Sequence, residues 1–440
     1  MEAHTAPLTH RQFLAVTLPL MLSTATQPLL GAVNTAMMGH MEDGRYIAAV
    51  ALGVILFNSI YWLFGFLRVS TTTFAAQACG RHNSEDSTVA LLRPALLALL
   101  ISAGVWGIYP WLFDYYAAFM NPGDDVVRLM KIYCDWQIWG APFVLGNYVL
   151  LGWLMGQMHV RTNVAIQIST NVLNIVLAVL FVYGWGWNIV GVAAAYLIAQ
   201  ACGCAAGIAA IWRVRASLRL SALVRRQLSR ASAYVDIIKV NADLMIRTLC
   251  LLAINNLFAQ TGSRLGTDVL AANAVLLEII FIMAYLADGI ANGMSVFTGM
   301  ARGRSDVTLW RRTLTVGLHT AAVYMGLTAI VMALTGDVWI ALMTDLSHIM
   351  ALAHQYRWAL IAYPLCAPVG LVLYGMYTGI GETASIRNMM LIAVAVFVLG
   401  DLCLTARWGN DGLWLTYVGT YLLESVILTA FLPKARAHFA

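Results

Sequence analysis

Runs of about 20 apolar residues recur from one end of this 440-residue chain to the other, and no soluble domain fits between them. A helix of that length crosses the hydrocarbon core of a bilayer. Apolar residues make up 61% of the chain and charged residues 11%, against roughly 45–50% and about 25% in soluble proteins. The pattern therefore predicts an all-α membrane protein with many spans.

We predict twelve spans, six in each half of the chain. The first six cover 12–38, 47–77, 88–111, 132–156, 163–183 and 189–212, and the second six cover 238–261, 269–300, 313–335, 353–380, 387–406 and 412–432. Between the halves lies an arginine-rich stretch. We therefore expect an N-terminal six-helix lobe at 1–212, a basic cytoplasmic linker at 213–237 and a C-terminal six-helix lobe at 238–440.

The distribution of lysine and arginine sets the expected orientation. These residues are numerous in the loops that follow even-numbered spans and near the termini, and sparse in the other loops. Because positively charged loops stay inside, we expect both termini in the cytoplasm and the protein in a bacterial inner (plasma) membrane. The net charge of +5 thus reports orientation, and no nucleic-acid partner is expected.

The two halves repeat with a shift of 223 residues. The shift lays Ala48, Phe74, Gly80, Arg81, Gly152 and Gly156 on Ala271, Phe297, Gly303, Arg304, Gly375 and Gly379. Each repeat has six spans, so both enter the membrane from the same side and form parallel repeats around a central cleft. Such a pair of bundles is suited to alternating access.

Ionisable side chains inside the spans are candidates for ion coupling, because a charge in lipid is costly unless it is paired or functional. Glu278, Asp288, Asp401 and Glu424 all fall in the second half, with Glu424 closer to the end of its span. Asp243 and Arg247 have the i,i+4 spacing of a pair on one helix face, and we interpret them as a structural bridge.

Other polar and aromatic side chains at membrane depth are candidates for the substrate cleft, although ordinary packing is an equal alternative for each. Asn34 follows a proline and a glycine inside the first span, where it either joins two helices or lines a pathway. The cleft candidates are Arg68, Tyr61, Trp62, Tyr148, Trp153, Tyr374, Tyr377 and Asn292.

Signs of catalysis are lacking. We find no nucleophile–base set, metal-ligand cluster or phosphate loop, so we expect no enzyme, no metal site and no cofactor. The seven cysteines lie mostly in apolar runs and show no CxxC spacing.

Four stretches resemble the DinF-type branch of the multidrug and toxic compound extrusion (MATE) family. They are PLLGAVNTAMMGH at 28–40, LRVSTT with AQACG at 67–80, LLGWLMG at 150–156 and NVLNIVL at 171–177. The resemblance implies a twelve-helix, two-lobed exporter that uses a proton or sodium gradient to expel amphipathic, often cationic compounds.

The chain departs from that family at two acids. The resemblance implies an aspartate where Asn34 stands and often a second where Ala178 stands, whereas Asn174 is retained. An amide cannot titrate and offers a cation only a neutral carbonyl. Asp401 is the repeat counterpart of Ala178, so the second half carries an acid at the position equivalent to the one that Ala178 occupies in the first half. The ion-coupling candidates are Asp401, Glu278, Asp288, Asn34 and Asn174.

The resulting hypothesis is a monomeric exporter in the lipid bilayer that exchanges H+ or Na+ for amphipathic organic cations. Two alternatives stay open. One is a flippase for lipids or lipid-linked precursors from the same superfamily, which would be expected to carry extra spans and a strongly cationic cleft. The other is an uncoupled facilitator, which the missing acids favour.

Overall fold

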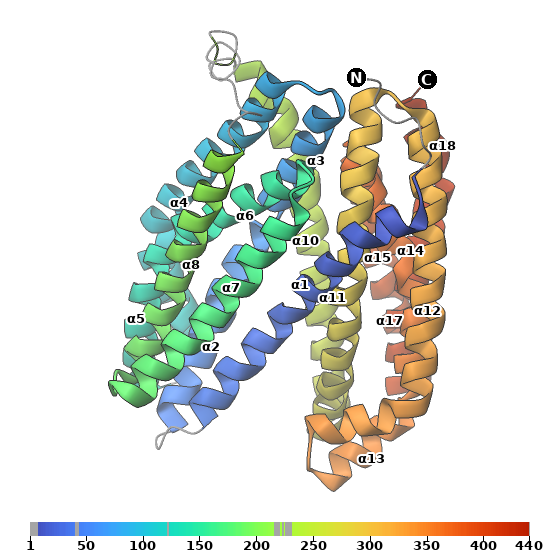
Figure 1. Cartoon of the computed structure of the whole chain (residues 1–440). Coiled ribbons are helices and arrows are strands. Elements are labelled where there is room, and N and C mark those ends of the chain that lie inside the picture. The colour runs from blue at the N-terminus through green and yellow to red at the C-terminus, as the bar shows by residue number, and fades with distance from the viewer. Residues whose placement is uncertain are drawn as a thin grey trace. The chain divides into compact units, whose positions relative to one another are not determined.

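The computed structural model describes residues 8–39, 44–120, 123–214, 221, 224 and 231–439, and the side chains of all of these except 27–39, 44, 47 and 231–237. The chain is helical almost throughout (Figure 1). The first half comprises α1 His10–Gly39, α2 Gly44–Leu63, α3 Phe66–Gly80, α4 Ser84–Met120, α5 Asp124–Gln137, η1 Ile138–Gly140, α6 Ala141–Gly156, α7 Val160–Val179, η2 Leu180–Gly184 and α8 Asn188–Arg213. The second half comprises α10 Ala231–Leu265, α11 Thr267–Arg304, α12 Val307–Met343, α13 Ser347–Gln355, α14 Trp358–Ile380, α15 Thr383–Gly400, η4 Asp401–Thr405, α16 Ala406–Trp408, α17 Asn410–Ala430 and α18 Leu432–Ala437.

The predicted number of spans is confirmed. In the described residues, eleven helical stretches are long and apolar enough to cross a bilayer, the first at Ala48–Gly80 and the last at Asn410–Ala437. Helix α1 adds the twelfth, because 30 residues at about 1.5 Å each exceed the thickness of the hydrocarbon core. Predicted span two is built from two helices, α2 and α3, which are interrupted at Phe64 and Gly65.

The chain divides into two compact units. The amino-terminal unit is Thr26–Ile238, and the carboxy-terminal unit is Lys239–Ala440 together with Met1–Ala25. From the sequence we expected residues 1–25 in the first lobe. Two glycines of α11 explain their place: a Cβ at Gly289 would overlap the main chain of Met21, and one at Gly293 would overlap the side chain of Thr17. The start of α1 therefore packs closely on α11. Most of the predicted linker, 213–237, lies outside the described residues.

Equivalent helix contacts in the two units confirm the repeat. Gly152 on α6 faces the main-chain carbonyl of Arg68 on α3, where an added Cβ would come within 2.6 Å of the oxygen. Gly375 on α14 faces the main chain of Ala291 on α11 in the same way, and both partners are shifted by 223 residues. In both halves the fifth span also ends in a π-helical turn, at Leu180–Gly184 and at Asp401–Thr405.

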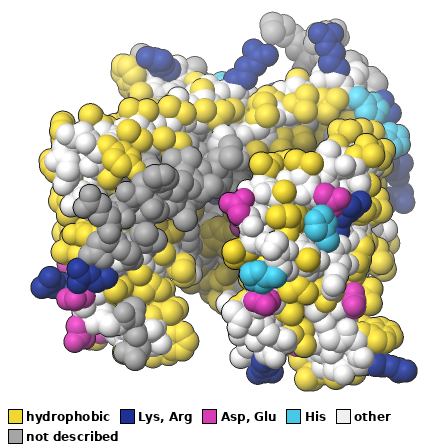
Figure 2. Space-filling view, turned by 90° about the horizontal axis from the view of Figure 1, so that it is seen from below, with side chains coloured by type: hydrophobic (Ala, Val, Ile, Leu, Met, Phe, Trp, Pro, Cys, Tyr) yellow, Lys and Arg dark blue, Asp and Glu magenta, His cyan; other side chains and the backbone are white. Residues whose placement is uncertain are grey.

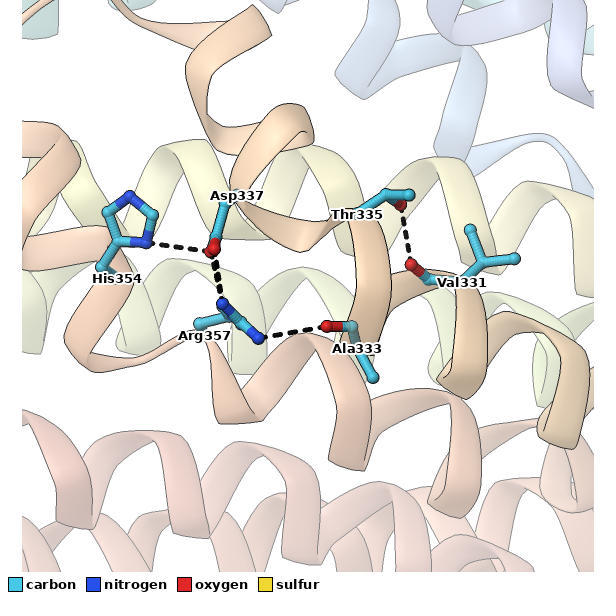
Figure 3. Close-up of polar contacts among 6 residues, drawn as sticks. All are labelled: Val331, Ala333, Thr335, Asp337, His354 and Arg357. Carbon is cyan, nitrogen blue, oxygen red and sulfur yellow. Dashed lines mark hydrogen bonds and ion pairs between the residues drawn. The ribbon is translucent and has the colours of Figure 1, made fainter.

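Helix α13 caps the carboxy-terminal unit at the end opposite the C-terminal helix α18 (Figure 1). Asp337 at the end of α12 binds His354 Nδ1 at 3.0 Å and both its oxygens accept from Arg357 Nη1, at 2.7 and 2.6 Å. Arg357 also donates to the carbonyl of Ala333 and so joins α14 to α12, while Asp337 joins α12 to α13 through His354 (Figure 3). Figure 2 looks onto this end of the molecule, where histidine and acidic side chains lie close together among hydrophobic ones.

Candidate functional site

In the amino-terminal unit, the amide of Asn174 is a buried polar group within a predicted span. It lies on α7, its side chain is 2% exposed, and neither its nitrogen nor its oxygen has a hydrogen-bond partner. Ala178 is buried one turn later on the same face of the helix. Because both positions carry a group that cannot ionise, this buried face holds no titratable charge. The side chain of Asn34 lies outside the described residues.

Arg68 is the charged candidate of this unit. It is half-buried on α3, and its Nη2 donates to Oε1 of Gln167 on α7 at 3.3 Å. Tyr148 on α6 lies within its electrostatic range. Arg68 therefore contacts a residue that the sequence did not single out, Gln167, and also influences a second cleft candidate, Tyr148, electrostatically.

Three aromatic candidates are held by hydrogen bonds to main-chain carbonyls. Tyr61 donates to Gln137 at 3.3 Å, Trp153 donates to Ser87 at 2.9 Å and Tyr377 donates to Leu428 at 2.9 Å. All three rings are buried. Since their polar atoms already have partners, these side chains join helices within their own unit. Trp62, in contrast, is 44% exposed.

In the carboxy-terminal unit, Asp401 lies where α15 passes into its final π-helical turn. Its Oδ2 accepts from Thr261 Oγ1 on α10 and its Oδ1 from Thr405 Oγ1, both at 2.8 Å. The carboxylate is half-buried and so joins α10 to the end of the eleventh span. Both oxygens are thus satisfied by hydroxyl groups.

The two acids of α11 have different surroundings. Asp288 is half-buried and its Oδ2 accepts from Nδ2 of Asn292 at 3.0 Å, one turn along the same helix. Two predicted candidates are therefore in direct contact. Glu278 is exposed.

The predicted bridge between Asp243 and Arg247 is wrong. Asp243 instead binds Arg387 Nη1 at 2.7 Å and accepts from Thr383 Oγ1 at 2.8 Å, so it ties α10 to α15. The guanidinium of Arg247 lies 3.9 Å from the ring centroid of the candidate Tyr374 on α14. Helical spacing allowed the intrahelical pair, but Asp243 and Arg247 each contact a residue of another helix instead.

Glu424 is the polar residue that sequence reasoning undervalued. As expected, it lies toward the carboxy-terminal end of α17, but the residue is only 9% exposed and its Oε1 has no hydrogen-bond partner. The signal was present in the spacing of Tyr417, Tyr421 and Glu424, which puts all three on one face of a helix. Among the residues that the structure describes, no three His, Cys, Asp or Glu side chains gather as metal ligands.

Two parallel six-helix repeats with ionisable side chains at membrane depth define a membrane transporter of the secondary class. Comparison with known proteins agrees. The MatE family matches residues 19–180 and 244–400, and the chain belongs to this family.

Three relatives illustrate the range of similarity. DNA damage-inducible protein F of Escherichia coli K12 is 32% identical over 420 residues, which cover 94% of this chain and 90% of that protein. A probable multidrug resistance protein NorM of Acinetobacter baylyi is 21% identical, over 93% of this chain and 92% of that protein. One solved structure is described as the outward-facing conformation of a multidrug resistance MATE family transporter. It matches with a TM-score of 0.87 at 19% identity, over 98% of this chain and 96% of that one. The solved structure supports the fold alone.

Proposed function

We propose that this protein is a secondary active exporter that exchanges H+ or Na+ for amphipathic organic cations by alternating access. The supporting observation is the set of acidic side chains at membrane depth in the carboxy-terminal unit, in a chain of the MatE family. Intramembrane acids are rare, and they commonly mark ion pathways. The multidrug-resistance name of a distant relative is consistent with this substrate class.

Coupling requires a group whose charge changes with ion occupancy. Position 174 offers an amide and position 178 a methyl group, so the acids of the carboxy-terminal unit take over this role. We rank Asp401 first for its repeat relation to Ala178, then Glu278, then Asp288. Binding of the ion to one of them removes a negative charge, weakens the hold on a cationic substrate and favours release to the outside.

The substrate is expected to be bulky and mostly apolar, with a positive charge. Arg68, Tyr148 and Asn292 are half-buried and provide polar and aromatic surface within the two units, whereas the buried ring of Tyr374 already faces Arg247. Aromatic faces attract organic cations, and apolar walls exclude small hydrophilic compounds. We further propose that the protein works as a monomer in a bacterial inner membrane with both termini in the cytoplasm.

An uncoupled facilitator is the second candidate. It is favoured by the two non-ionisable side chains, Asn174 and Ala178, on the buried face of α7. A facilitator moves substrate down its own gradient and does not respond to an imposed ion gradient.

Reconstitution into liposomes separates these candidates. Efflux of the fluorescent cation ethidium is followed under an imposed pH gradient, an imposed sodium gradient or neither. Asp401→Asn, Glu278→Gln and Asp288→Asn are compared with the parent protein after each has been shown to fold. We expect at least one to lose gradient-driven efflux. If all three retain it, coupling does not reside in these acids, and if no gradient accelerates the parent, the protein is a facilitator.

A further inference from the structure

A second group of polar side chains lies deep inside the carboxy-terminal unit and includes none of the three acids ranked above. It is formed by Glu424, Tyr421 and Tyr417 on α17, Tyr363 on α14 and Asn255 on α10. Tyr417 and Tyr363 are buried, and Tyr421 and Asn255 are half-buried. We call these five residues the Glu424 cluster.

Hydrogen bonds and ring contacts hold four members of the cluster in place. The hydroxyl of Tyr417 donates to Asn255 Oδ1 at 3.3 Å and lies 3.4 Å from the hydroxyl of Tyr421. The Tyr421 ring meets that of Tyr363 edge-on, with 5.0 Å between centroids. These contacts fix α17 against α10 and α14, and all three tyrosines are close enough to Glu424 to interact with it electrostatically.

The fifth member, Glu424, is not satisfied in the same way. Its Oε1 is buried and without a hydrogen-bond partner, and among the described residues no cation lies within ion-pair distance of the carboxylate. Arg247 acts on it electrostatically, but its guanidinium is stacked on the ring of Tyr374. A buried carboxylate without a direct counter-charge is strongly disfavoured unless it takes up a proton or another cation.

The repeat shows that the fold does not need this polar cluster. A shift of 223 residues lays Glu424, Tyr417 and Tyr363 on Ala201, Ala194 and Gly140 of the amino-terminal unit. Those three positions are small and apolar, yet the unit forms the same helices. The polar residues have therefore been placed in one unit only, as expected of a functional site.

We propose that Glu424 is a proton-binding site of the exporter, neutral while buried in this arrangement and charged when the helices around it admit water. A proton suits the site better than a metal ion, because Asn255 Oδ1 and the Tyr417 hydroxyl already bond to each other. The ionisable groups that face or influence Glu424 are Tyr417 and Tyr421 from its own helix, Tyr363 from α14 and Arg247 from α10. Arg247 would balance the charge in the deprotonated state. The part of Glu424 in ion coupling rests on the exporter function proposed above.

Infrared spectroscopy tests proton binding independently of transport. The purified protein and its Glu424→Gln variant are titrated from acidic to alkaline pH, and the C=O band of a protonated carboxyl group is followed. We expect a band that titrates in the parent and is missing from the variant. Asp411→Asn, which removes an exposed acid from the same helix, is the control and should leave the band in place. Identical titrations in the parent and Glu424→Gln would overturn the proposal, as would a band that responds to Na+ at constant pH.

Transport then tests the role in coupling. Glu424→Gln should bind ethidium but lose its pH-driven efflux from liposomes, whereas Asp411→Asn should retain both. If Glu424→Gln does not fold, Glu424→Asp replaces it, with a shifted pH midpoint of both the band and efflux as the expected result. Retained pH-driven efflux in Glu424→Gln, or an unshifted midpoint in Glu424→Asp, would refute the role of Glu424. A parent protein that never transports would instead refute the exporter function, and the infrared result would still decide whether Glu424 binds a proton.

Discussion

Gly375 in α14 packs directly against the main chain of Ala291 in α11, so that a methyl group at position 375 would overlap the carbonyl of Ala291. Replacing Gly375 with alanine must push the two helices apart. We expect the free energy of unfolding to fall by about 1–3 kcal/mol, as in other overpacked interiors. Thermal unfolding of the purified protein in detergent measures this effect.

Gly326→Ala is the matched control, because a Cβ at that position of α12 would meet nothing within 4 Å. Its unfolding temperature should stay the same or rise slightly, since alanine favours helix over glycine. Equal unfolding temperatures for Gly375→Ala and Gly326→Ala would show that the close approach of α14 and α11 is wrong.

Asp243 and Arg387 form a partly buried ion pair between α10 and α15, with side chains 12% and 36% exposed. Asp243→Asn should lower the free energy of unfolding by about 1–3 kcal/mol, between the values typical of exposed and of fully buried pairs. A double-mutant cycle with Arg387→Met isolates the pair from the rest of the packing. If the two single effects simply add, the side chains do not interact in the folded protein.

Asp337 holds α13 through His354 and binds Arg357 with both carboxylate oxygens. Asp337→Asn removes the charge and should loosen this corner. Since exposed ion pairs contribute little, we expect only about two- to fivefold faster amide hydrogen exchange in residues 347–355. Asp345→Asn removes a neighbouring exposed acid and should leave the exchange unchanged. Equal acceleration by both changes would assign the effect to surface charge in general.

The C-terminal helix α18 lies at the end of the carboxy-terminal unit opposite α13 (Figure 1). Because loops rich in lysine and arginine stay inside, reporter fusions after Ala216 and at the C-terminus should indicate the cytoplasm. Fusions near Gly123 and Gly262 should indicate the outside. Fusions that place the C-terminus and the position after Ala216 on opposite sides would contradict an even number of spans in the second half.

The sequence alone was enough to predict a membrane protein with twelve spans and a 223-residue repeat. Lipid as a solvent demands long apolar runs, and each run can be recognised without knowing its neighbours. The repeated glycines were also visible, and their partners Arg68 and Ala291 obey the same shift.

The tertiary structure decided which side chains meet. Helical spacing suggested that Asp243 pairs with Arg247, but α15 brings Arg387 to Asp243 and α14 brings Tyr374 to Arg247. Asp401 proved to be satisfied by two threonines, whereas the less prominent Glu424 proved to be buried with an unbonded oxygen. Hydropathy measures how a segment partitions into lipid, but it contains no information on which face of one helix is turned toward which neighbour. That choice depends on contacts between residues more than a hundred positions apart, and these exist only once the helices have packed.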